Sequence, residues 1–217
     1  MGGEALASVA LDSRGLVGDR GFAVVDEEGR FASGKNTRRM VRRDGIFAFS
    51  ARTLPDAVVG SSAVVASSPN GEWAVGDPAL DAELSRALDA PVRVLAESTT
   101  PHFDDGAVSL IGTATLDWCR REFGADADAR RLRANLLVET TEPFEEEHWE
   151  NQVTIGDVVL APAGRIERCR TIDLDQDGVG SNTRWLQPLG RQRDTRVAIY
   201  LDVVTQGELA VGQDLQT

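Results

Sequence analysis

Residues 152–160 read QVTIGDVVL, and this stretch decides the fold class. Two short apolar runs flank the turn Ile155-Gly156-Asp157, which predicts two strands joined by a tight hairpin. Working outward, further short runs that predict strands occur at 22–31 (around a turn at 26–29), 46–49, 63–66, 92–95, 135–138, 197–201 and 203–204. Many short strands with few helices predict a mainly β fold with α (α+β), built on a β-barrel with helical decoration.

Two segments have helical spacing. Apolar residues recur every four positions from Leu80 to Leu88, after Asp77 as a cap and Pro78 at the first helical position. A second helix is expected from Thr115 to Phe123, capped by Thr113 or Thr115 and ended by Gly124. Cys119 would lie on its apolar face as a small buried residue.

Composition excludes several classes of partner. The chain has 217 residues, a formal net charge of −12 and a single lysine, Lys35. An acidic surface repels nucleic acid and anionic lipid, so neither is expected as a partner. There is no run of 18 apolar residues, hence no expected membrane span. With two cysteines and no C-x-x-C pair, a reduced, cytoplasmic setting is the better expectation.

Cys169 is the first candidate for chemistry. It stands between Arg168 and Arg170, and flanking cations favour the thiolate, which is both nucleophile and metal ligand. The alternative is a buried structural cysteine whose neighbouring arginines face solvent. Local sequence does not choose among the metals that bind soft sulfur.

A second candidate is the run Arg131-Leu132-Arg133-Ala134-Asn135. Strand alternation would place Arg131, Arg133 and Asn135 on one face, where they could grip a phosphate or the edge of a pterin. The alternative is a set of solvated edge residues. Two weaker motifs are 33–39, a basic loop containing glycine without the Walker spacing, and 173–178, an acidic turn that superficially resembles a calcium loop. The twelfth position of that loop is Arg184, so an ordinary acidic turn is favoured.

Several blocks, taken in order, resemble one family, the MOSC-domain proteins. They are 14–20, 22–26 and 30–35, which resemble the N-terminal β-barrel domain, and 131–136, 144–149, 155–160, 168–169 and 211–212, which resemble the MOSC domain proper. The order is more specific than any single block. The resemblance spans residues 4–215 and implies an N-terminal β-barrel domain at 1–96 and a MOSC domain at 104–217.

The family includes the C-terminal domain of molybdenum cofactor sulfurase and the mitochondrial amidoxime reducing component. The resemblance implies that molybdenum cofactor (molybdopterin) is bound, with Cys169 as metal ligand and catalytic residue. It implies cofactor contacts from Arg133, Asn135, Lys35 and Arg168. Lys35 stands where the family often has an arginine.

Two departures from the family pattern bear on the site. The family opens with a strand that ends in Pro-Val-Lys-Ser and helps bind the cofactor phosphate, whereas this sequence opens at Met1-Gly2-Gly3-Glu4. Either that strand lies upstream of Met1, which we expect, or the protein lacks it and binds the cofactor poorly. The acidic turn after Cys169 also comes a couple of residues early, which affects the rim of the expected pocket.

Three functional hypotheses follow. The first is an oxidoreductase that reduces N-hydroxylated or similar small substrates with electrons from a separate protein, since no cysteine cluster for an iron–sulfur centre is present. The second is a sulfur or cofactor carrier without turnover of its own. The third is a cofactor-free barrel. Pyridoxal-phosphate desulfurase chemistry is disfavoured because it needs a Schiff-base lysine, and the only lysine lies in a segment that matches another role.

Overall fold

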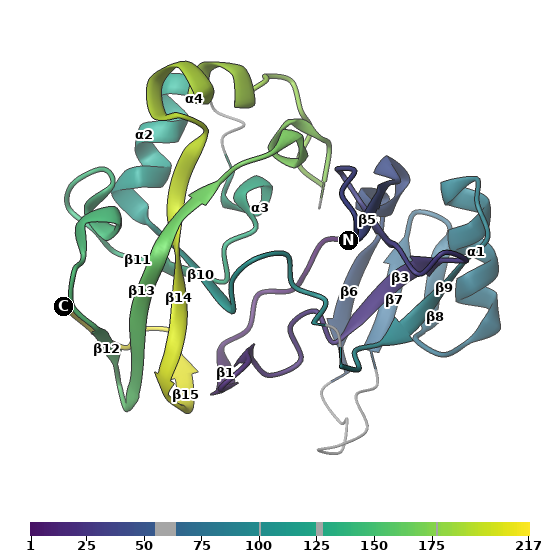
Figure 1. Ribbon diagram of the computed structural model, residues 1–217, viewed down its shortest axis with the longest axis horizontal. Coiled ribbons are helices and arrows are strands. Elements are labelled where there is room, and N and C mark those ends of the chain that lie inside the picture. The colour runs from purple at the N-terminus through teal and green to yellow at the C-terminus, as the bar shows by residue number, and fades with distance from the viewer. Residues whose placement is uncertain (55–63, 100, 125–127, 177) are drawn as a thin grey trace. The chain divides into compact units, whose positions relative to one another are not determined.

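The computed structural model of the chain describes residues 1–54, 64–99, 101–124, 128–176 and 178–217 (Figure 1). Two compact units are present, and each takes segments from separate parts of the chain. The first unit consists of Met1–Ala5, Arg20–His102 and Leu174–Gly180; the second consists of Leu6–Asp19, Phe103–Asp173 and Ser181–Thr217. No helix among the described residues is long and apolar enough to cross a membrane.

The second unit is built on a six-stranded, nearly closed, barrel-like sheet with the order β11-β10-β14-β13-β12-β16. Its strands are β10 (Val108–Gly112), β11 (Leu136–Val138), β12 (Val153–Ile155), β13 (Val158–Glu167), β14 (Arg196–Thr205) and β16 (Leu215–Gln216). A three-stranded sheet, β15-β1-β2, completes the unit, with β1 (Ser8–Asp12), β2 (Gly15–Leu16) and β15 (Gly207–Ala210). The predicted mainly β fold with added helices is confirmed.

The hairpin at 152–160 forms as predicted. Strands β12 and β13 are antiparallel, and Ile155 pairs with Val158 across the turn. Gly156 adopts φ 58°, a left-handed conformation that glycine enters without steric cost. The long strands β13 and β14 lie side by side, with helices α2 (Thr113–Phe123) and α4 (Leu186–Arg193) at one end and β15 at the other (Figure 1).

Helices of the second unit cover an apolar core beside the sheet. Besides α2 and α4, they are α3 (Ala129–Leu132) and the 3-10 turns η2 (Glu145–His148) and η3 (Arg170–Asp173). Helix α2 buries Leu116, Cys119 and Phe123 on one face, and the predicted burial of Cys119 is confirmed. It begins at Thr113 rather than Thr115, and its N-cap is Gly112 with no side-chain cap bond. The predicted threonine cap is therefore wrong: Thr113 and Thr115 instead accept hydrogen bonds from the backbone of residues 140 and 144.

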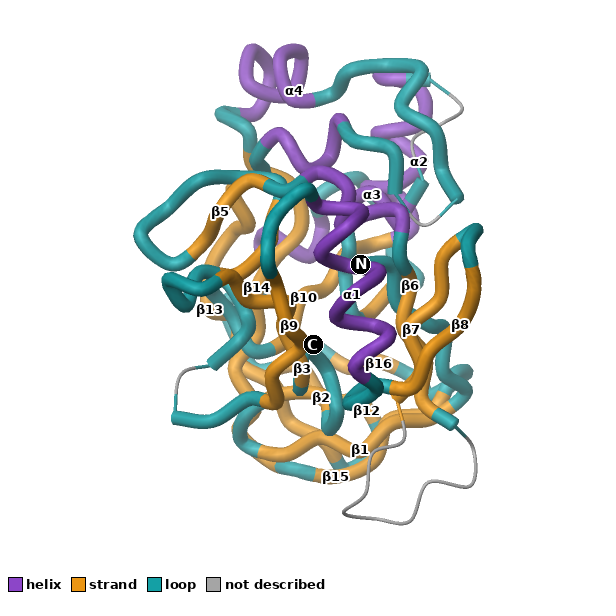
Figure 2. Tube along the Cα trace, turned by 90° about the vertical axis from the view of Figure 1, so that its right-hand side faces the viewer, coloured by secondary structure: helices purple, strands orange, loops and turns teal. Residues whose placement is uncertain are grey.

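The first unit contains two sheets and one long helix. The sheet β5-β4-β3-β9 has β3 (Phe22–Asp26), β4 (Phe31–Ser33), β5 (Met40–Arg42) and β9 (Val92–Ala96); the sheet β6-β7-β8 has β6 (Ser50–Thr53), β7 (Val64–Ser68) and β8 (Gly71–Ala74). Helix α1 (Pro78–Leu88) contacts β8 and β9, one strand of each sheet (Figure 2). The predicted hairpin at 22–31 and the strands at 63–66 and 92–95 are confirmed, although Ala63 lies outside the described residues.

Helix α1 follows its sequence closely. The Asp77 side chain accepts a 2.8 Å hydrogen bond from the Ala79 amide, and Pro78 occupies the first turn. Leu80, Leu84 and Leu88 are all buried in the core of the first unit. Spacing by four residues places three large side chains on one stripe, which explains the orientation of the helix.

The predicted strand at 46–49 is wrong. These residues belong largely to the 3-10 turn η1 (Asp44–Ala48), which is closed by a hydrogen bond from the Ile46 amide to the Arg43 carbonyl. Ile46, Phe47 and Phe49 are all buried in the same core. A flat strand would have sent neighbouring side chains to opposite faces, so packing into one core favours the turn.

Candidate functional site

Cys169 lies in the second unit, between the end of β13 and η3. Its side chain is half-buried, whereas Cys119 is fully buried in the apolar core. The Cys169 thiol donates to the Thr171 hydroxyl over 3.2 Å, and the Cys169 carbonyl accepts from the Ile172 amide at 3.2 Å. The thiol therefore lies on a tight turn, outside the apolar core.

Arg168 points into the unit rather than into solvent, so that part of the structural alternative for Cys169 is wrong. Its Nε donates to the Val197 carbonyl at 3.0 Å and its Nη1 to the Leu132 carbonyl at 2.7 Å. Burial lowers the pKa of Arg168 to about 10, and Tyr200 and the two thiols partly oppose that shift. Its Nη2 is buried and has no hydrogen-bond partner among the described residues.

The backbone around Arg168 is strained. The Arg168 amide donates to the Thr195 carbonyl. Its side chain donates to the carbonyls of Leu132 and Val197, which directly precede Arg133 and Ala198. Thr195, Arg133 and Ala198 are non-glycine residues with left-handed backbone, at φ 63°, 56° and 71°. Ala198 lies in an irregularity of the β13–β14 pairing. Such conformations cost roughly 1–3 kcal/mol each and concentrate at functional sites, where the surrounding structure holds them.

The predicted alternation of Arg131, Arg133 and Asn135 along a strand is wrong. Residues 129–132 form the short helix α3, begun by the Asp128 side chain, which accepts from the Arg130 amide at 2.9 Å. Arg133 is the left-handed residue that ends this helix, and the strand begins only at residue 136. The helical turn breaks the alternation, and Arg131 and Asn135 bind different segments of the chain.

Arg131 is fully buried and anchors two distant segments. Its Nε donates to the Ile172 carbonyl at 2.8 Å, and its Nη2 donates to the Thr183 carbonyl at 3.2 Å. The guanidinium lies 4.8 Å from the centre of the Trp185 ring, a cation–π distance. Neither the phosphate-gripping nor the solvated-edge interpretation of Arg131 holds, because the side chain is engaged inside the protein.

Asn135 joins two backbone segments of the second unit. Its Oδ1 accepts from the Ser109 amide at 2.9 Å and from the Ser109 hydroxyl at 2.7 Å. Its Nδ2 donates to the Asp19 carboxylate at 3.1 Å. The amide thus secures the strand β10 and the 6–19 segment at the place where β11 begins.

Lys35 belongs to the first unit, in the loop between β4 and β5. That loop is held by its own side chains: Asn36 Oδ1 accepts from the Arg42 amide at 2.7 Å, and Thr37 Oγ1 accepts from the Met40 amide at 3.1 Å. Lys35 itself is half-buried. The second unit therefore holds Cys169, Arg168, Arg133 and Asn135 in one compact body, while Lys35 comes from the other unit.

The acidic turn after Cys169 has a structural use. Asp173 Oδ1 accepts from the amides of Trp185 and Leu186, at 2.6 and 3.2 Å, and so satisfies backbone donors at the start of α4. Asp177 lies outside the described residues. Across the described part of the chain, no group of three or more His, Cys, Asp or Glu side chains could hold a metal ion.

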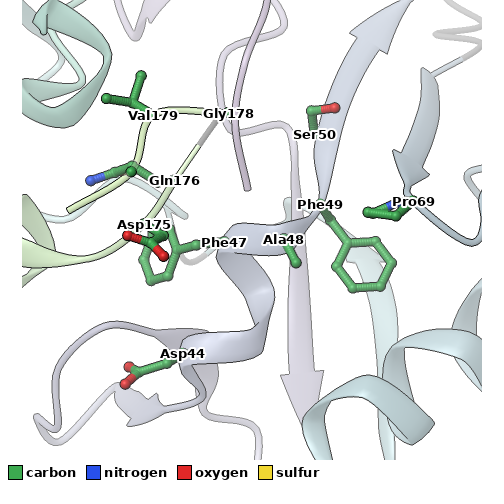
Figure 3. Close-up of a pocket in the computed structure, with 11 residues that line it drawn as sticks. Asp44, Phe47, Ala48, Phe49, Ser50, Pro69, Asp175, Gln176, Gly178 and Val179 are labelled. Atoms are coloured by element: carbon green, nitrogen blue, oxygen red, sulfur yellow. The ribbon is translucent and has the colours of Figure 1, made fainter. Parts of the chain in front are cut away.

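A cavity of about 540 Å³ lies in the first unit (Figure 3). Phe47, Phe49 and Val179 provide apolar walls, and Asp44 and Asp175 place carboxylates at it. None of the predicted site residues lines this cavity. Its volume alone does not make it a site for the chemistry expected of Cys169.

Comparisons with known proteins point to one family. The sequence at residues 97–216, more than half of the chain, matches the MOSC domain family. Molybdenum cofactor sulfurase from Homo sapiens is 34% identical over 67 residues, which are 31% of this chain and 7% of that protein. The Anopheles gambiae molybdenum cofactor sulfurase is 31% identical over 107 residues, covering 43% of this chain and 14% of that protein.

The chain thus matches only a small part of these relatives. A crystal structure described as an hypothetical protein aligns with 51% of this chain and 50% of that chain, at 15% identity and a TM-score of 0.37. The family match, by contrast, covers Cys169, Arg168, Arg133 and Asn135 together. The chain belongs to the MOSC domain family.

Proposed function

We propose that this chain binds molybdenum cofactor in its second unit and that Cys169 is the protein ligand of the metal. One observation carries the proposal: within a MOSC domain, a half-buried thiol lies outside the apolar core, on a turn fixed by the half-buried Arg168. The similarity to molybdenum cofactor sulfurases supports a function related to this cofactor.

The donor set around Cys169 fits such a guest. A thiolate is a soft ligand that suits molybdenum. Arg168 keeps one buried N–H group without a partner among the described residues, and a bound anionic group would satisfy it. Because no cluster of three metal-binding side chains occurs among those residues, the remaining ligands would come from the cofactor itself.

The other predicted contacts take distinct roles in this proposal. Arg133, at the end of α3, would bind an anionic group of the cofactor through its charge. The cofactor contact expected of Lys35 remains a prediction of the family resemblance. Asn135 would hold the backbone at the base of the site, since its side-chain amide already binds Ser109 and Asp19. The cofactor supplies the redox chemistry, and the chain's own residues hold and orient it.

We propose an oxidoreductase that reduces N-hydroxylated or similar small substrates. Electrons would come from a separate protein, because the sequence shows no cysteine cluster that could hold an iron–sulfur centre. The assay is reduction of a small N-hydroxylated compound with a chemical electron donor. Turnover by the wild type and loss of turnover in Cys169→Ser is the expected result.

Metal analysis tests the ligand assignment directly. Wild-type protein expressed in cells that make the cofactor is expected to contain about one molybdenum atom per chain, held through its thiolate ligand. Cys169→Ser should lose the metal, whereas the matched control Cys119→Ser should keep it, since Cys119 lies in the apolar core. Unchanged molybdenum in Cys169→Ser would overturn the proposal.

A second candidate, a sulfur or cofactor carrier, is favoured by the relatives' own description as sulfurases. Cys169 would then carry a persulfide. Mass spectrometry of the isolated protein separates the two functions, because a persulfide adds the mass of a sulfur atom at Cys169. A third outcome, a protein without visible absorption from a bound metal–pterin centre, would indicate a cofactor-free barrel.

A further inference from the structure

Two arginines tie the turn around Cys169 to helix α3. One hydrogen bond involves the residue before the cysteine, and the other involves a residue after it. Arg168, the residue before Cys169, donates to the Leu132 carbonyl of α3 at 2.7 Å. Arg131 of α3 donates back to the Ile172 carbonyl, three residues after Cys169, at 2.8 Å. The turn is therefore held at both ends by the same short helix, and that helix ends at Arg133.

Arg131 is suited to this task by its shape. Its guanidinium reaches the Ile172 and Thr183 carbonyls from different nitrogens and also stacks over Trp185. A planar fork of donors can bind two fixed carbonyls at once, which a lysine ammonium on a flexible stem reproduces poorly. Full burial makes each of these hydrogen bonds costly to lose.

We propose that Arg131 is a positioning residue for Cys169: it holds η3 against α3 so that the thiol and Arg133 are presented together to a bound cofactor. The inference rests on the proposed function for its purpose, but the positioning itself can be measured without cofactor. Residues that orient a metal ligand without touching the metal typically change metal affinity by about 10–100-fold when they are substituted.

The chain offers a matched control on the same helix. Arg130 is the neighbour of Arg131, is exposed, and pairs with Asp128. The variants are Arg131→Lys and Arg131→Gln, with Arg130→Lys and Arg130→Gln beside them. Each is prepared as the full chain without cofactor, and thermal unfolding is recorded first to confirm that the variant folds.

The first readout is the rate at which iodoacetamide alkylates Cys169. Loss of one hydrogen bond to a charged group shifts a local opening equilibrium toward the open form by roughly tenfold or more. Arg131→Gln should therefore raise the alkylation rate of Cys169 by about that factor. Arg131→Lys should lie between Arg131→Gln and the wild type, and both Arg130 variants should match the wild type. A residue that only stabilises the core would lower the unfolding temperature without this specific change.

The second readout is molybdenum content after expression with cofactor, which should fall in both Arg131 variants. An altered alkylation rate with no molybdenum in any protein would leave the positioning intact and overturn the proposed function instead. Wild-type alkylation rates in a folded Arg131→Lys and Arg131→Gln would overturn the positioning role. Loss of the whole fold in both variants would also overturn it, since Arg131 would then serve the core in general.

Discussion

The guanidinium of Arg168 donates a 2.7 Å hydrogen bond to the carbonyl of Leu132, 36 residues earlier in the chain. This bond joins the residue before Cys169 to the residue before Arg133. The backbone after Leu132 is under constraint, because Arg133 adopts a left-handed conformation that non-glycine residues rarely enter. The candidate ligand and the candidate anion contact are thus linked by the half-buried side chain of Arg168.

The two cysteines should differ sharply in reactivity. Burial raises the pKa of Cys119 to about 12, so this thiol remains protonated and inaccessible in the folded chain. In cofactor-free protein we expect an aromatic disulfide reagent to titrate Cys169 alone, and both cysteines after unfolding. Cys119→Ala should keep the reactive thiol and Cys169→Ala should remove it. Rapid labelling of Cys119 would show that the apolar core around it is open to the reagent.

Asn135→Ala should destabilise the chain even without cofactor. The substitution removes the acceptor of the Ser109 amide and hydroxyl. A buried donor left unsatisfied costs about 1–3 kcal/mol, which should appear as a lower free energy of unfolding in urea. The control is the exposed Asn151→Ala, expected to change the free energy of unfolding by less than about 0.5 kcal/mol. Equal stabilities for the two variants would disprove this structural role.

Glu146 should make stability depend on pH. It is buried, its Oε2 accepts from the Thr115 hydroxyl at 2.9 Å, and its Oε1 has no hydrogen-bond partner among the described residues. Burial raises its pKa above the ordinary value of 4.5, with a smaller contribution from Glu147. The folded chain therefore binds this proton more tightly than the unfolded chain, and the free energy of unfolding falls as pH rises from 4.5 through the raised pKa.

Glu146→Gln tests this dependence because the amide does not titrate. Urea unfolding of both proteins at a series of pH values above 4.5 should show the variant gaining stability relative to the wild type as pH rises. Subtracting the free energies of unfolding of the two proteins at each pH removes the contributions of the other carboxylates, which both proteins share. Parallel curves across the series would show that Glu146 has the same pKa in the folded and unfolded chain.

Gly112→Ala should be poorly tolerated for reasons of space. A Cβ at this position would lie 2.8 Å from Glu146 Oε2 and closer still to Thr140 Oγ1. Overpacking of this kind typically costs about 1–3 kcal/mol, and a thermal unfolding scan would report it as a lowered transition temperature. Gly3→Ala is the matched control, because nothing lies within 4 Å of its Cβ position. An unchanged transition temperature in Gly112→Ala would show that the loop carrying Thr140 can shift to accommodate the added methyl group without loss of stability.

Much of the fold follows from local patterns that the sequence displays. The helix α1 has a carboxylate cap, a proline in its first turn and leucines spaced by four. The hairpin at 152–160 combines apolar runs with a glycine turn. In these elements the side chains that select the conformation lie within a few residues of one another. The period and the cap are therefore sufficient to predict them.

The errors arose where another influence, distant packing in one case and a helix cap in the other, outweighed local alternation. Ile46–Phe49 has the composition of a strand, yet one core takes up its three large side chains and the backbone forms a 3-10 turn. Residues 131–135 alternate as a strand would, yet Asp128 begins a helical turn there. The signal for this second case was present in the sequence, since aspartate is a strong N-cap residue.

By itself the sequence determined the β-rich class, the family blocks and the choice of Cys169 as the candidate ligand. Only the tertiary structure decided how that cysteine is held. Arg131 and Arg168 bind backbone carbonyls of residues 29 to 52 positions away. Every residue carries such a carbonyl, so no pattern of side chains reveals which one a buried arginine will meet until the chain has folded around it.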